Sequence, residues 1–407
     1  MKNNKVTDTH GASLVRSKRL LIIFTSVFLG CVLLFGIIFG TIALVRNSRS
    51  VMRYKGIYLN EGVSNYLCTS FKYDYIRSLN RMGIECYDTD AFWASDTEDG
   101  KTQGELLSER TEEYLKQVIV GSYLFDRNTR LSKDDKAVIN KAVTEVLEYR
   151  ANADVSYFNE LAEDMGFTYR DFKTATEMLY KYEMAQKVIF GYDGASLSSG
   201  MFGAECDEYF ESTYARVKLM IIRTEGEYAI DPETGKEVYS EFDEDKKAQI
   251  QDTIGYIRTL IYNTENEVAD VGMNELAFDS YIKDHFPTGT VNDAEGYYFS
   301  PVSSYSVEFA LDAPEVVRKA LSLDVGHYAE AEIDVGVCFI YRCPLEEGAY
   351  ERISLAHFFS DFYERASDYL YICSLESYSE YVTVKDKYDK YAIIDKPYNQ
   401  IFSVKFG

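Results

Sequence analysis

Proline is scarce in this chain, and its absence from one half is informative. The 407 residues contain six prolines, and all six lie after residue 231. The first half therefore contains no residue that would break a long helix. The chain also contains no GxSxG elbow, HExxH motif, Walker loop or GxGxxG fingerprint. The sequence thus gives no support for the hydrolase, metalloprotease or nucleotide-binding classes that these motifs mark.

Cysteines are also few, and they are not spaced as metal ligands. None of the seven lies in a CxxC pair or beside a histidine, so we predict no zinc site, no other metal and no cofactor. Six of them are spread over the chain after residue 31. We interpret these as buried or surface thiols rather than a disulfide framework, because such frameworks are typical of small secreted domains. They are Cys68, Cys86, Cys206, Cys338, Cys343 and Cys373.

Positive charge is in deficit. The chain has 43 Lys and Arg against 66 Asp and Glu, which gives a formal net charge of -23. Binding to nucleic acid would begin with electrostatic repulsion, so we expect no nucleic-acid partner. Hydrophobic residues make up 46% of the chain, including 35 tyrosines and 24 phenylalanines. This content is too high for a disordered acidic chain, and we expect a folded protein.

The longest uncharged run covers residues 20–45 and lies between basic flanks. A helix needs roughly 20 apolar residues to cross a membrane, whereas a cleavable signal peptide has a shorter apolar core. A lipoprotein cleavage box at residues 28–31 is a second alternative, but fourteen uncharged residues follow Cys31, which a lipid anchor would not need. We predict a cytoplasmic tail at 1–19 and an uncleaved anchor at 20–45. The basic residues on the two sides, five before and four after, barely favour this orientation.

Residues 46–202 have the periodicity of amphipathic helices. Apolar residues recur at three- and four-residue spacing through 106–124, and capping-box patterns begin at Ser132 and Thr168. We therefore predict an all-α domain over 46–202. The stretch 191–203 (GYDGASLSSGMFG) breaks the helical pattern and indicates a domain boundary.

The pattern becomes mixed after that boundary. We predict a helix at 205–211, a buried strand at 217–222, a protruding hairpin or loop at 227–242, and helices at 244–261 and 274–284. A strand at 296–299, a helix at 314–321 and a last strand at 335–342 follow. Helical periodicity with an aromatic face returns from residue 351. The fold class is therefore α+β, with an α+β domain at 203–344 inserted into a helical domain that 345–407 completes.

This order of elements, together with two strings, resembles the parvulin (PpiC-type) family of peptidyl-prolyl isomerases. Residues 214–224 (YARVKLMIIRT) look like the family's first strand. Residues 314–326 (PEVVRKALSLDVG), followed by 336–340, are similar to its last helix, turn and closing strand. With the anchor and the helical segments on both sides, the whole chain beyond residue 56 resembles SurA- and PrsA-type extracytoplasmic foldases.

The resemblance departs from the family at its functional positions. The two histidines that parvulins usually carry beneath the substrate proline correspond to Leu219 and Cys338, and the pocket Phe and Met correspond to Val316 and roughly to Asp312. An apolar groove for an X-Pro segment would remain. Ordinary core packing is the alternative interpretation, and we favour it for Leu219, Val316 and Phe339. The predicted groove consists of Leu219, Met220, Tyr298, Phe299, Val316, Cys338 and Phe339.

The resemblance implies a single-pass membrane protein whose bulk lies outside the cytoplasm and binds unfolded or secreted polypeptides. Its isomerase-like domain would have reduced or lost activity, because the paired histidines are replaced. Two alternatives remain open at this point. The chain could be a holdase whose inserted domain is a structural relic, or an envelope interaction module with one fixed partner.

Overall fold

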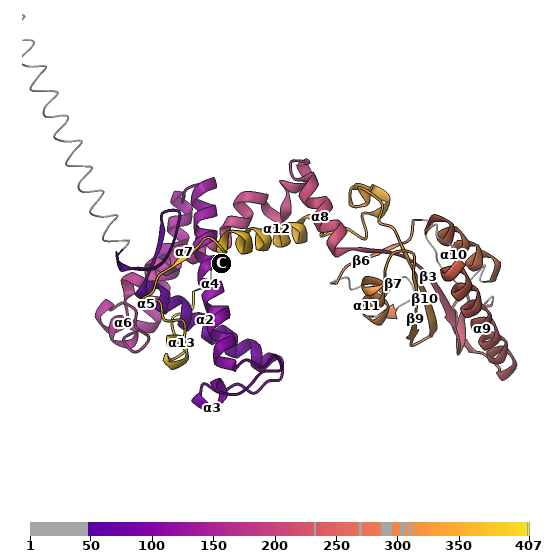
Figure 1. The fold of residues 1–407 in the computed structure, drawn as a ribbon, viewed down its shortest axis with the longest axis horizontal. Coiled ribbons are helices and arrows are strands. Elements are labelled where there is room, and N and C mark those ends of the chain that lie inside the picture. Colours follow the sequence, from indigo (N-terminus) through magenta and orange to yellow (C-terminus); the bar gives the residue numbers. More distant parts are fainter. Residues whose placement is uncertain are drawn as a thin grey trace, which may run out of the picture. The chain divides into compact units, whose positions relative to one another are not determined.

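The computed structural model describes residues 48–231, 233–267, 271–285, 295–301, 306–307, 311–312, 314–404 and 406 (Figure 1). The chain divides into two compact units. Unit 1 comprises Met1–Ile189 and Tyr371–Gly407, and unit 2 comprises Phe190–Leu370. The predicted anchor at 20–45 lies outside the described residues. Within the described ranges, none of the helices combines the length and the apolar character needed to cross a bilayer.

Unit 1 is built mainly of helices whose starts are fixed by side-chain caps. At Ser132 and Thr168 the hydroxyl accepts the backbone N–H three residues on, and Asp135 and Asp171 accept the backbone N–H of the capping residue in return. Both predicted caps are therefore confirmed. The helices are α2 (Glu61–Arg81), α3 (Asp90–Trp93), α4 (Gln103–Asn128), α5 (Lys133–Ala151), α6 (Val155–Leu161), α7 (Tyr169–Phe190) and α13 (Ala392–Asp395).

Unit 1 is not all-α, and that prediction is wrong. Strands β1 (Ser50–Tyr54), β2 (Ile57–Asn60) and β11 (Thr383–Val384) form an antiparallel sheet in the order β11-β1-β2. Lys55 and Gly56 link β1 to β2 with φ angles of 39° and 92°, which suits a two-residue hairpin turn. The strands are too short to give a periodic signal, and β11 comes from the far end of the chain.

The C-terminal segment completes the core of unit 1. The Phe402 ring lies 4.3 Å from that of Phe158, centroid to centroid, and contacts Phe167 and Phe172. The Tyr66 hydroxyl donates a hydrogen bond of 2.9 Å to the Phe402 carbonyl oxygen. A core that joins residues more than 300 positions apart couples the two ends of the chain in one cooperative unit.

Unit 2 is centred on an antiparallel sheet in the order β6-β3-β10-β9. These strands are β3 (Ala215–Arg223), β6 (Tyr297–Phe299), β9 (Tyr328–Ile333) and β10 (Gly336–Cys343). Helices α9 (Glu244–Glu267) and α10 (Val271–His285) pack on one face of the sheet, and α11 (Pro314–Ser322) packs on the other (Figure 1). The remaining elements are α8 (Gly203–Thr213), β4 (Gly226–Ile230), β5 (Glu237–Glu241), β7 (Ser306–Val307) and β8 (Leu311–Asp312).

Most elements predicted for this region are present, with two corrections. Strand β9 is missing from the predicted elements, because its central residues 329–332 are Ala and Glu, which are depleted in strands, and the two-residue strands β7 and β8 are missing from them as well. The returning helix α12 (Phe362–Ser379) begins eleven residues later than residue 351. The intervening chain instead forms the short 3₁₀ turns Ala349–Glu351 and Ile353–Leu355, which bury Tyr350 and Leu355. The boundary between the two units falls within α12.

Candidate functional site

Strands β3 and β10 bring together the two positions at which parvulins usually carry histidine. Leu219 pairs with Ile340 and Cys338 pairs with Ile221, so Leu219 and Cys338 are diagonal neighbours on the same face of the sheet. Helix α11 covers this face and buries Val316. Leu219, Cys338 and Val316 are 2%, 1% and 3% exposed. We call this part of the sheet the α11 face.

The seven predicted groove residues do not share one face. Phe299 pairs with Ala215, which places it on the α11 face with Leu219, Cys338 and Val316. Met220 and Phe339 lie on the opposite face, in the core against α9 and α10. Tyr298 pairs with Arg216 and is therefore also on that opposite face. All seven side chains are buried. Their role in binding a client stays a prediction, as does that of Asp312, which lies in β8.

The α11 face offers little acid–base chemistry among the described residues. Burial raises the pKa of the Cys338 thiol to about 12, so it stays protonated at neutral pH and is neither a nucleophile nor a base. The Arg342 guanidinium donates to the carbonyl oxygens of Ala320 and Tyr214, and burial lowers its pKa. What remains is an apolar surface that could act only through shape and exclusion of water, which is how an amide rotation without covalent steps is assisted.

Tyr298 is buried with an unsatisfied hydroxyl. Its side chain is 0% exposed, and the hydroxyl has no hydrogen-bond partner within the described part of the chain. Burial raises its pKa to about 12. We expect Tyr298→Phe to change the free energy of unfolding by less than about 0.5 kcal/mol, or to stabilise unit 2, because no bond is lost.

The matched control for that substitution is Tyr350→Phe in the same unit. The Tyr350 hydroxyl donates to the Asp207 carboxylate at 2.7 Å, so its loss should cost about 1.5–3 kcal/mol. Urea unfolding followed by far-ultraviolet circular dichroism measures both variants. Equal destabilisation by the two substitutions would show that Tyr298 has a partner after all.

Sequence reasoning missed the exposed apolar residues of the hairpin β4–β5. The predicted hairpin is present, and three of its apolar side chains are exposed: Ile230, Val238 and Tyr239 are 73%, 50% and 44% exposed. The register pairs Ile230 with Glu237, so Ile230 and Tyr239 share one face of the hairpin and Val238 lies on the other. The turn signal at 231–235 located the hairpin, but no sequence pattern shows that these three side chains are exposed.

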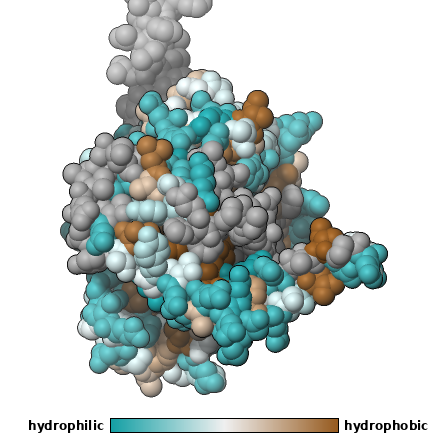
Figure 2. Space-filling model, turned by 90° about the vertical axis from the view of Figure 1, so that its right-hand side faces the viewer, coloured by the Kyte–Doolittle hydropathy of each residue, from teal (hydrophilic) through white to brown (hydrophobic). Residues whose placement is uncertain are grey.

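Exposed apolar residues also occur elsewhere, among them Met82, Ile84 and Tyr87 in the irregular segment after α2. The face drawn in Figure 2 is mainly hydrophilic, with its hydrophobic residues in small separate patches. Single exposed residues such as Leu276 and Ile353 are ordinary on soluble proteins. The hairpin differs from them because three exposed apolar residues lie together on two paired strands.

A cavity of about 1130 Å³ in unit 1 is lined by described residues. Its lining balances three basic residues against three acidic ones, so its charge does not indicate a ligand class. No group of three or more His, Cys, Asp or Glu residues within the described ranges is placed to hold a metal ion. The charged residues that line the cavity are Arg49, Arg170, Lys387, Glu61, Asp171 and Glu177.

Comparisons with known proteins give little further guidance. No family model and no curated protein sequence matches the chain. Among solved structures, the crystal structure of PrsA from Bacillus subtilis is similar at 15% sequence identity, covering 74% of this chain and 94% of that one. The TM-score is 0.17, and the similarity therefore carries no argument about fold or function.

Proposed function

We propose that this chain is a membrane-anchored folding factor outside the cytoplasm that binds unfolded polypeptide, with weak or lost prolyl isomerase activity. The single observation that supports client binding most directly is the exposure of three apolar side chains on the hairpin β4–β5. Ile230, Val238 and Tyr239 offer apolar contacts next to paired backbone strands, and extended polypeptides bind such elements through alternate side chains. The family resemblance of the inserted domain supports the same class of function.

The proposed loss of isomerase activity rests on the α11 face. Leu219 and Cys338 occupy adjacent positions there; a leucine side chain has no hydrogen-bonding group and a thiol is only a weak donor, so neither can replace a histidine. Loss of such a polar network in an active site typically lowers the rate roughly a hundredfold or more. Uncatalysed isomerisation takes tens to hundreds of seconds, so even weak catalysis would shorten the slow phase measurably.

The hairpin is tested by removing its apolar side chains. We expect Ile230→Ser/Val238→Ser/Tyr239→Ser to lose most of the ability of the full chain to suppress aggregation of a denatured client diluted from urea. Light scattering measures the aggregation of the client. In a separate assay, the wild-type protein should leave the slow cis/trans isomerisation phase of a proline-containing peptide unchanged. The variant Leu276→Ser/Ile353→Ser, which removes exposed apolar residues elsewhere in unit 2, should retain suppression.

Two results would contradict the proposal. Equal suppression by the hairpin variant and the wild type would remove the hairpin as the client contact. Strong isomerase catalysis by the wild type that is lost in Val316→Ala would show that the α11 face is an active site without its histidines. Circular dichroism of each variant establishes that it is folded, which matters for Val316 because its side chain is buried.

A further inference from the structure

The small sheet of unit 1 concentrates positive charge in an otherwise acidic chain. Residues 48–60 and 383–390 contain six basic residues and two acidic ones, Asp386 and Asp389, whereas the whole chain carries a net charge of -23. Arg49, Arg53, Lys55 and Lys387 are exposed, and Lys385 is half-buried. We call these five the basic surface. Arg49 and Lys387 also line the cavity of about 1130 Å³, where three acidic residues offset part of their charge.

Strand pairing holds three of these cations close together. Arg53 lies opposite Thr383 in the β1–β11 ladder, and the backbone N–H of Lys385 donates to the Val51 carbonyl oxygen at 3.0 Å. The pKa of Lys385 is lowered by burial and by the neighbouring charges of Lys387 and Arg53. The lowered pKa shows that these cations lie close enough to act on one another, so an anion bound beside them would be attracted by all three.

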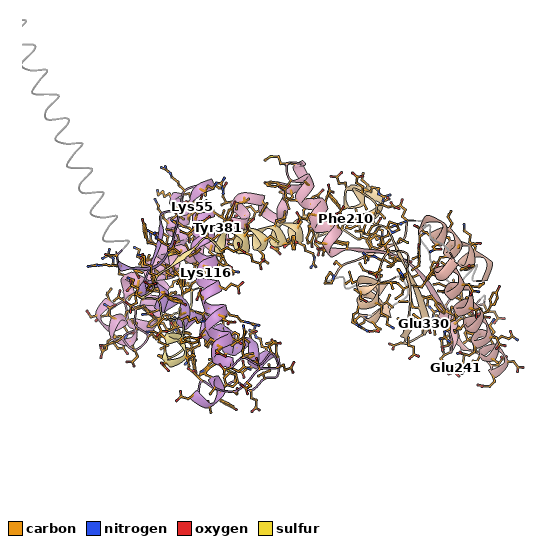
Figure 3. All side chains as sticks on the ribbon, in the orientation of Figure 1. Lys55, Lys116, Phe210, Glu241, Glu330 and Tyr381 are labelled. Atoms are coloured by element: carbon orange, nitrogen blue, oxygen red, sulfur yellow. The ribbon has the colours of Figure 1, made fainter. Side chains whose placement is uncertain are left out.

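Tyrosines accompany the cations. A hollow of about 620 Å³ is lined by Arg53 and Lys55 together with Tyr58, Tyr378 and Tyr381. The Tyr381 side chain is 70% exposed, and Figure 3 shows it near Lys55. The Lys55 Nζ atom also lies 5.7 Å from the centroid of the Tyr378 ring. Basic residues mixed with tyrosine are typical of surfaces that lie at the level of lipid headgroups.

Chain length places this sheet next to the predicted anchor. The anchor ends at residue 45 and β1 begins at Ser50, and five extended residues span at most about 18 Å. The Lys387 Nζ atom donates to the Ser48 carbonyl oxygen at 2.9 Å, so the segment 383–390 also lies beside the start of β1, close to the end of the predicted anchor. This step rests on the anchor in the proposed function.

We propose that the basic surface and its tyrosines bind the headgroups of anionic phospholipids in the leaflet from which the chain emerges. The attraction of each Lys or Arg to such a surface adds to that of its neighbours and falls within a Debye length. Contact at five cations would fix the orientation of unit 1 on the membrane, and the acidic remainder of the chain would be repelled from the same surface.

The test uses the full chain reconstituted into vesicles of phosphatidylcholine alone or with added phosphatidylglycerol. Hydrogen exchange of the backbone amides in 48–60 and 383–390 is measured by mass spectrometry. We expect exchange in both segments to slow by about tenfold with the anionic lipid, and to recover in high salt. The variant Arg53→Gln/Lys385→Gln/Lys387→Gln should lose this difference, and Lys385→Arg/Lys387→Arg should keep it.

The matched control is Lys133→Gln/Lys136→Gln/Lys141→Gln, which removes the same charge from exposed positions on α5 and should keep the lipid effect. The proposal would be overturned if wild-type exchange were the same in neutral and anionic vesicles. It would also be overturned if this control lost the lipid-dependent slowing of exchange as fully as the variant at Arg53, Lys385 and Lys387. Release of the chain from vesicles by an alkaline wash would instead show that the anchor is absent. Suppression of client aggregation should be the same in all of these variants, which separates failure of the lipid proposal from failure of the folding role.

Discussion

Replacing Lys72 with methionine is expected to destabilise unit 1 by about 3–5 kcal/mol, because the substitution leaves buried polar groups without a partner. Lys72 is 0% exposed. Its Nζ atom donates to the carbonyl oxygens of Ile394 at 2.9 Å and Lys396 at 2.7 Å, and lies 2.7 Å from the Asp88 carboxylate. One buried cation thus joins helix α2 to the C-terminal segment and to the loop before α3.

Urea unfolding followed by tryptophan fluorescence measures this effect, because Trp93 is the single tryptophan and lies in unit 1. The midpoint should fall by about 1 M or more. Lys141→Met is the matched control, because the Lys141 side chain is 77% exposed and its ion pair with Glu145 is long, at 3.8 Å. We expect a change within about 0.5 kcal/mol there. Similar midpoints for the two variants would show that the contacts of Lys72 contribute nothing to stability.

Arg216→Met is expected to have an effect of similar size in unit 2. Arg216 is 4% exposed on β3. Its guanidinium makes a bidentate pair with Glu275 of α10 at 2.9 and 3.2 Å, and also donates to the Glu295 carbonyl oxygen at 2.7 Å. A second carboxylate, that of Glu346, lies 2.9 Å away. Removing the cation takes a partner from both carboxylates and the donor from the Glu295 carbonyl oxygen. Glu275 keeps Lys218 and Glu346 keeps Arg352, so we expect a loss of about 3 kcal/mol.

Hydrogen exchange of the backbone amides in β3 and β10 reports on this loss, since unit 2 contains no tryptophan. The double variant Arg216→Met/Glu275→Leu should recover part of the stability, because it removes both members of the pair. Arg318→Met is the control, because the Arg318 side chain is 69% exposed and pairs with Glu315 on the same helix. Unchanged exchange in Arg216→Met, or equal effects at Arg216 and Arg318, would refute this role.

The candidate site could be predicted from the sequence only in part. The strings at 214–224 and 336–340 located the strands that carry Leu219 and Cys338, and a regular alternation on paired strands then makes these two positions neighbours. The same alternation places Met220 and Phe339 on the opposite face. Their position next to Leu219 and Cys338 in the sequence had suggested one groove, but adjacent residues on a strand point to opposite sides of the sheet.

The exposed hairpin and the basic surface needed the tertiary structure. The turn residues predict a protruding hairpin or loop at 227–242, but which of its apolar side chains are exposed, such as Ile230 at 73% and Val238 at 50%, follows only from the folded structure. The charges of the basic surface lie in two segments more than 300 residues apart. No local pattern connects Arg53 with Lys387, and only the pairing of β1 with β11 places them on one surface.

Local sequence patterns are sufficient to predict the caps at Ser132 and Thr168, the long helices of the first half and most helices and strands of the inserted region, β9 excepted. These features depend on contacts between residues a few positions apart, where periodicity and capping act directly. The tertiary structure decided that unit 1 contains a sheet, that the seven groove residues divide between two faces, and that Lys72 and Arg216 are buried among partners. Such features arise from contacts between distant segments, whose free energy exists only once the chain has folded and excluded water from them.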